Sequence, residues 1–180
     1  YSLADYEAHM RSAAPWLNHI GGVGVEALPN DDRGADEMEW AMKAVHEAST
    51  AEKRYTFSAR LNLLSPSAAA EVDRLVSMGI VAVRQILNFE PPWPFVTENL
   101  LRNEAWIAEL KALPSKGIKI FELHCNTHQL LEAAAIVEQC PQLTFVLNHM
   151  GNRRDGVDDY RVWLTGVTAI AASKHCYVKI

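Results

Sequence analysis

Two histidines stand at the ends of separate apolar segments, His124 in FELHCNTHQ and His149 in FVLNHMG. A neutral imidazole can transfer a proton near neutral pH and can ligate a divalent metal ion such as zinc. A single histidine of this kind more often only hydrogen-bonds a strand-end carbonyl group. Two at equivalent positions favour chemistry instead, so we predict His124 and His149 as catalytic residues that could also ligate a metal.

Arg84 is a fixed cation inside the apolar segment VAVRQ. A buried guanidinium needs an anionic partner, because an unpaired charge is costly to remove from water. A substrate carboxylate or lactone carbonyl would fit, and so would a structural ion pair with Glu26 or Glu122. The residues leave these two alternatives open.

Three further charged residues lie at or near the ends of other apolar segments, and we predict a substrate-binding role for them: Glu26, Arg60 and Lys179. Glu26 could ligate a metal or act as a base, but it could equally pair with an arginine or cap a helix. Lys179 could polarise a carbonyl group.

Short β-branched segments alternate with helical patterns along the chain, as expected of βα units around a parallel sheet. The strands are expected at residues 20–27, 55–63, 80–87, 118–125, 143–149 and 176–180. The helices are expected at 36–53, 66–78, 101–113, 128–140 and 158–173, with Asp36 and Ser65 as N-caps of the first two. Nearly continuous apolar runs such as FVLNH suit strands that are buried on both faces.

The carboxyl ends of parallel strands meet on one face, where active sites of βα proteins are built. We therefore expect the candidate residues to lie close together on that face. A closed barrel and an open doubly wound sheet give the same local pattern, although no GxGxxG motif follows the first strand to favour a dinucleotide fold. The sequence thus indicates the α/β class.

The composition is that of an ordinary globular domain, and residues 1–180 are expected to form a single domain. The chain has 180 residues, of which 49% are hydrophobic and 22% charged, with a net charge of −5. Scattered Lys and Arg argue against nucleic acid as a partner, and the absence of a long apolar run argues against a membrane. Three cysteines without a CxxC pair favour a reducing, cytoplasmic location.

The ordered segments VGVEA, GIVAVRQIL, FELHCNTHQL, PQLTFVLNHMG and CYVKI resemble amidohydrolase family 2, the predicted metal-dependent hydrolases that include sugar-lactone and 2-pyrone-4,6-dicarboxylate lactonases. The resemblance covers most of the chain. It implies a (β/α)8 TIM barrel that hydrolyses a lactone or related carboxylic ester with activated water. His124, His149 and Arg84 would then bind or polarise the carbonyl. Some members use a divalent metal and others none, so zinc is one option.

Members of this family usually begin with a strand that carries His-x-His and end with one that carries an Asp for the attacking water. We find neither motif, and therefore expect a partial barrel of about six βα units that lacks the first and last strands and has little activity alone. The alternatives are a decarboxylase of the same superfamily and a non-catalytic βα-repeat fragment. The expected partners are a small lactone or carboxylate and, through open strand edges, a second copy of the chain.

Overall fold

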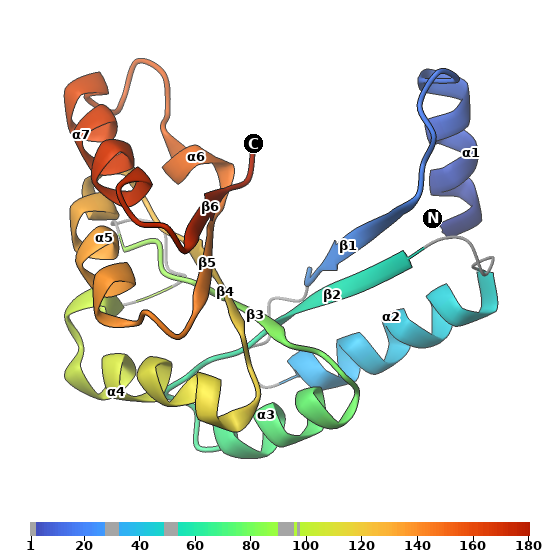
Figure 1. Ribbon diagram of the computed structural model, residues 1–180, viewed down its shortest axis with the longest axis horizontal. Helices are drawn as coiled ribbons and strands as arrows, with labels where there is room; N and C mark the ends of the chain where they lie inside the picture. The colour runs from blue at the N-terminus through green and yellow to red at the C-terminus, as the bar shows by residue number, and fades with distance from the viewer. Residues whose placement is uncertain (1–2, 28–32, 49–53, 90–95, 97) are drawn as a thin grey trace.

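The described residues of the chain form one curled sheet of six parallel strands. The computed structural model describes residues 3–27, 33–48, 54–89, 96 and 98–180. The strands are β1 (Gly21–Val25), β2 (Arg54–Arg60), β3 (Ala82–Ile86), β4 (Ile120–His124), β5 (Thr144–Leu147) and β6 (Cys176–Val178). Their order in the sheet is their order in the chain, and every neighbouring pair is parallel. The sheet curves into a half-barrel, which is the architecture of a partial TIM barrel (Figure 1).

The helices cover the convex face of this sheet (Figure 1). They are α2 (Gly34–Ala48), α3 (Ala68–Ser77), α4 (Glu104–Ala112), α5 (Leu130–Gln139) and α7 (Tyr160–Ala171), with the short 3-10 helices η1 (Leu100–Arg102), η2 (Leu113–Lys116) and η3 (Thr127–Gln129). The helical turn α6 (His149–Asn152) follows β5, and α1 (Leu3–Ala13) precedes β1. The helix α1 was not predicted from the sequence.

The predicted alternation of strands and helices is confirmed, and each observed strand is slightly shorter than its expected range. The expected end of the helix at 36–53 lies partly outside the described residues, which stop at 48 and resume at 54. The predicted partial (β/α)8 barrel is therefore the observed fold.

The hydrophobic core lies between the convex face of the sheet and the helices. Trp106 of α4, Phe121 of β4 and Phe145 of β5 are fully buried there. The ring of Phe121 packs edge to face against both Trp106 and Phe145. The indole Nε1 of Trp106 donates a 2.9 Å hydrogen bond to Gln85 Oε1, so the one polar atom of this ring is paired. Because the apolar side chains of the strands point toward this core, the alternate side chains point toward the concave face.

Both predicted N-caps are wrong. The helix α2 begins at Gly34, so Asp36 lies inside its first turn, and α3 begins at Ala68 with Ser67 at the N-cap position. The Oγ atom of Ser65 instead accepts a 3.2 Å hydrogen bond from the backbone N–H of Ser67, in the turn before the helix.

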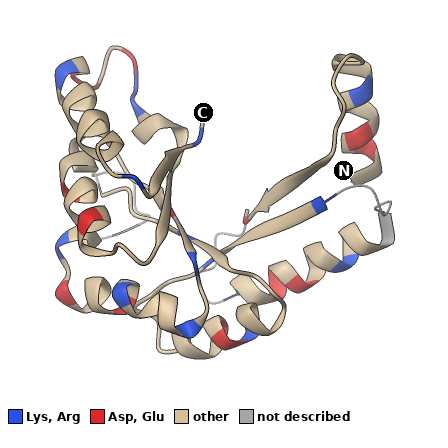
Figure 2. Cartoon of the chain, in the orientation of Figure 1, with Lys and Arg blue, Asp and Glu red and all other residues tan. Residues whose placement is uncertain are grey.

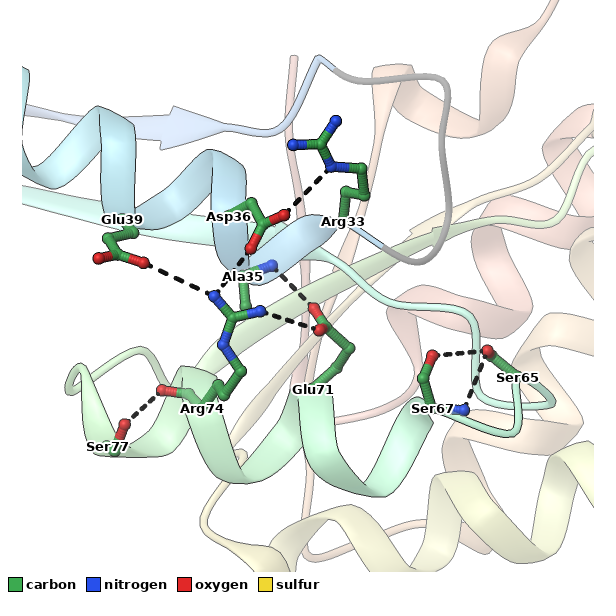
Figure 3. A network of polar contacts seen from close by, with 9 residues as sticks. All are labelled: Arg33, Ala35, Asp36, Glu39, Ser65, Ser67, Glu71, Arg74 and Ser77. Carbon is green, nitrogen blue, oxygen red and sulfur yellow. Dashed lines mark hydrogen bonds and ion pairs between the residues drawn. The ribbon is translucent and has the colours of Figure 1, made fainter.

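The first turn of α2 is held by a side chain from α3. Glu71 is almost fully buried, and its Oε2 accepts a 2.9 Å hydrogen bond from the backbone N–H of Ala35 (Figure 3). Arg74 bonds Glu71 at 3.3 Å and Asp36 at 2.8 Å, which joins the two helices. The guanidinium groups of Arg74 and Arg33 lower the pKa of Asp36. The carboxylate of Glu71 therefore supplies the cap that the sequence assigns to Asp36.

Charged residues of both signs are spread along the helices (Figure 2). This distribution fits the scattered Lys and Arg of the sequence. Among the helices of the described residues, none is both long and apolar enough to span a bilayer.

Candidate active site at the carboxyl ends of the strands

The concave face of the half-barrel carries charged and polar side chains. In β4, Phe121 and Leu123 are fully buried in the helix-facing core, so the alternate residues Glu122 and His124 face the other way. The register sets these positions in two rows across neighbouring strands. The first row contains Arg60, Arg84 and Glu122, and the second, nearer the carboxyl ends, contains His124, Asn148 and Lys179.

The two predicted catalytic histidines lie in contact. The ring centroids of His124 and His149 are 5.3 Å apart, with an angle of 72° between the ring planes. His149 follows β5 and is exposed, whereas His124 ends β4 and is partly buried. The Nδ1 atom of His124 is buried without a hydrogen-bond partner. The two imidazoles together form an edge-to-face pair that can reach one bound molecule.

The surroundings of His124 keep its ring uncharged at neutral pH. Burial, the largest cause, lowers the pKa of His124 to about 4 together with the neighbouring groups Arg84, His149 and Lys179, while the carboxylate of Glu122 acts in the opposite direction. A neutral imidazole can accept a proton through one nitrogen and donate a hydrogen bond through the other. The ring of His124 is thus held in the state that proton transfer or carbonyl polarisation requires.

Arg84 is paired with Glu26, which answers one question that the sequence left open. Arg84 Nε and Nη2 donate hydrogen bonds of 2.8 and 2.6 Å to Glu26 Oε1, and Nη2 also bonds the Glu26 carbonyl oxygen at 3.0 Å. Arg60 lies 4.0 Å from Glu26 Oε2. All three side chains are buried or nearly so, and the carboxylate of Glu26 is thereby shared between two arginines. The pair fixes the guanidinium of Arg84 near His124.

Glu122 and Lys179 form a second, looser pair. The Nζ atom of Lys179 lies 3.6 Å from Glu122 Oε2, an ion-pair distance at which no hydrogen bond is formed. Lys179 is more exposed than Glu122, with 37% of its side chain accessible against 6%. Its ammonium group can therefore contact a bound molecule from its present position.

The backbone that carries His149 is unusual. His149, Met150, Gly151 and Asn152 all have positive φ angles, of 49°, 49°, 80° and 51°. Only glycine adopts this region without a penalty, and each other residue costs about 1 kcal/mol or more. Strain of this size persists only where surrounding contacts hold it, and it is concentrated at functional sites.

A metal ion needs more ligands than the described residues bring together. A catalytic zinc ion takes three or four ligands from the protein, and His124 and His149 supply two. Across the described ranges, no group of three or more His, Cys, Asp or Glu side chains could hold a metal ion. The donor set therefore does not fit a complete zinc site.

The cysteines beside the site are not activated nucleophiles. Burial raises the pKa of Cys125 to about 12 and that of Cys176 to about 11. At neutral pH both remain thiols, the poorly nucleophilic form.

Two polar residues of the site were not predicted as functional from the sequence. Glu122 precedes His124 by two residues in FELH, so the alternation of a strand would have placed both on one face. Asn148 is fully buried with neither polar side-chain atom hydrogen-bonded, and only the register reveals that it stands level with His124.

The fold is similar to solved amidohydrolase structures. An amidohydrolase from Burkholderia multivorans with bound HEPES matches with 16% identity and a TM-score of 0.71. Another crystal form of it, with bound Zn, matches with 15% identity and a TM-score of 0.72. In each case the match covers 99% of this chain and 58% of that one.

An amidohydrolase 2 from Bifidobacterium longum subsp. infantis matches with 23% identity and a TM-score of 0.59, over 100% of this chain and 60% of that one. At such identities the likeness concerns the fold, and the chain spans less than two thirds of the length of these proteins. No curated protein matches the sequence. The family model described as Amidohydrolase matches residues 4–180, so the chain belongs to the amidohydrolase family.

Proposed function

We propose that the chain forms the greater part of a hydrolase that opens a lactone or a related carboxylic ester with activated water. The contact between His124 and His149 supports this most directly. Two imidazoles at the carboxyl ends of adjacent parallel strands lie where reactions take place in barrels of this type. Family membership supports the wider class of reaction.

In this proposal the histidines act on the substrate carbonyl. His124 is neutral and can donate a hydrogen bond to the carbonyl oxygen, and His149 can approach the same oxygen because it is exposed. As water adds to the carbonyl carbon, negative charge develops on that oxygen, and donors already in place stabilise this charge. The resemblance assigns activation of the water to an Asp on another strand.

The cations of the site favour a substrate that carries a carboxylate. Arg84 is held rigidly by Glu26, while Lys179 is only loosely paired and more exposed. We therefore assign carboxylate binding to Lys179 and orientation of the carbonyl to Arg84. Glu26 and Arg60 act as the buried support of Arg84, and their substrate-binding role is indirect.

A divalent ion such as zinc would supply a Lewis acid for the carbonyl or for water, and the relative with bound Zn makes this a reasonable assay condition. His124 and His149 could contribute two ligands. The steps above are assigned to side chains of this chain and do not depend on the ion.

The test is hydrolysis of sugar 1,4-lactones and of a dicarboxylate lactone, followed through the acid released, in an eight-unit protein that contains this chain. Replacing His149 by Asn should lower turnover by about a hundredfold or more, the usual effect of removing an acid–base or carbonyl-binding group. Glu39→Gln is the matched control, because Glu39 is exposed on α2, the helix between β1 and β2, whereas His124 ends β4 and His149 follows β5. Unchanged turnover in the His149→Asn variant would refute the catalytic role.

A further inference from the structure

The four residues that follow β5 form a left-handed turn that neighbouring elements hold from several sides. The backbone N–H of Met150 donates to the Lys179 carbonyl oxygen at 3.2 Å, which attaches the turn to the residue after β6. The side-chain Nδ2 of Asn152 donates to the Cys125 carbonyl oxygen at 3.1 Å, which attaches it to the residue after β4. The turn is therefore tied to both strands that flank β5.

A third attachment comes from α7. The indole Nε1 of Trp163 donates a 2.7 Å hydrogen bond to the Met150 carbonyl oxygen. The guanidinium of Arg153 lies 5.8 Å from the Trp163 ring and 5.3 Å from the Tyr160 ring, and this stacking limits rotation of the indole. A long, rigid side chain on a helix thus reaches the backbone next to His149.

The middle of the turn has little space to change. Gly151 has a φ angle of 80°, and a Cβ atom there would lie 2.8 Å from both Cδ atoms of Leu130. The Oγ1 atom of Thr127 also donates to the Gly151 carbonyl oxygen, at 3.3 Å. Leu130 of α5 and Thr127 of η3 therefore fix Gly151, which lies between the hydrogen-bonded residues Met150 and Asn152.

We infer that Trp163 and Asn152 are positioning residues that act through His149. A β-region or right-handed conformation would be favoured at His149 and Met150 if the turn were free. Such a change would redirect the side chain of His149, which now packs against the ring of His124. The two attachments oppose this change from the α7 side and from the β4 side. The inference rests on the proposed function only in treating His149 as a group of the reaction.

The experiment measures the position of the ring directly. In the labelled 180-residue chain, NMR should show a nuclear Overhauser effect between the ring protons of His124 and His149. Trp163→Phe keeps an aromatic ring but removes the indole donor, and Asn152→Ala removes the amide donor. Each variant should lose most of this signal and shift the imidazole nitrogen resonances of His149. Leu164→Ala, an exposed change beside Trp163 on α7, should leave both unchanged.

Two variants on opposite sides of the turn keep the test decisive if one of them folds poorly. The inference is overturned if the signal persists in a folded Trp163→Phe or Asn152→Ala chain, or if the unsubstituted chain lacks it. Turnover in the eight-unit protein separates the two hypotheses. Loss of the ring contact with unchanged turnover would support the positioning inference and refute the catalytic role proposed for His149.

Discussion

At the scale of single residues, the ion pair of Glu26 and Arg84 determines how stable the site is. Glu26 is 1% exposed at its side chain and Arg84 12%, so removal of the Glu26 carboxylate leaves the Arg84 charge buried without its anionic partner. We expect Glu26→Gln to lower the free energy of unfolding by about 3 kcal/mol. Urea unfolding of the single variants and of the double variant Glu26→Gln with Arg84→Met measures the coupling. A double variant no more stable than Glu26→Gln would contradict this account.

His124 should make stability depend on pH. Its pKa is about 4 in the folded chain against an ordinary value of 6.5. Between these values the unfolded chain binds more protons, so the free energy of unfolding falls as the pH drops from 6.5 to 4 and is unaffected by this group above pH 6.5. Because the ring is only partly buried, the loss is on the order of 2 kcal/mol.

Urea unfolding at pH 7 and pH 4 tests this dependence. The carboxylates also lose their ion pairs toward low pH, so His124→Asn is compared with the unsubstituted chain at both values. The variant should lose less stability on acidification, by the amount assigned to His124. Equal losses in the two chains would show that His124 titrates normally.

The closeness of His124 and His149 in the candidate site could be predicted from the sequence, but the ion pairing around them could not. His124 and His149 end apolar strands, and the convergence of parallel strand ends brings them together. The choice of Glu26 rather than Glu122 as the partner of Arg84 depends on contacts across 58 residues of chain. The left-handed turn was not predicted: Gly151 and Asn152 are residue types that favour a positive φ angle, but methionine is not, and nothing in NHMGN indicates that the turn extends back to His149.

At the scale of elements, the start of α2 depends on α3 through Glu71. We expect Glu71→Ala to lower the free energy of unfolding by about 1–2 kcal/mol, the usual effect of losing a helix cap, because the N–H of Ala35 is left unpaired. Glu39→Ala, which removes a side chain that is 73% exposed and 3.6 Å from Arg74, should change it by less than about 0.5 kcal/mol. Thermal unfolding of both variants makes the comparison, and equal effects would disprove the cap.

The elements that the sequence predicted are those with buried faces. The strands β2 to β5 and the helices α2, α3, α4, α5 and α7 show periodic apolar residues because one side of each packs into the core. The helix α1 was missed since none of its residues is buried, so burial produces no apolar stripe in Leu3–Ala13. The N-cap of α2 was predicted wrongly for a different reason. Glu71, which binds the N–H of Ala35, lies 36 residues away in the chain.

At the scale of the whole molecule, the half-barrel has two open edges. Within the part of the chain that the structure describes, β1 pairs only with β2 and β6 only with β5. Exposed apolar side chains accompany both edges, with Val23 64% and Tyr177 62% exposed. Unpaired backbone groups beside apolar surface promote association of strands.

We therefore expect the 180-residue chain to associate with itself as its concentration rises. Val23→Lys and Tyr177→Lys should each reduce association, because a charged side chain disfavours pairing at an edge. Sedimentation velocity over a range of concentrations measures the effect, with Trp40→Lys on α2 as a control for the loss of an exposed apolar residue elsewhere. A concentration-independent monomer, or equal effects of all three changes, would exclude association through the edges.

The order of the strands also bears on how the protein is made. Each strand from β2 onward pairs with the strand that was synthesised just before it. None of the six described strands has to wait for a partner from a distant part of the chain, so each of these βα units can dock on the preceding one as it leaves the ribosome. The growing sheet then exposes one new edge at a time. The order of synthesis can therefore determine the order in which the βα units fold.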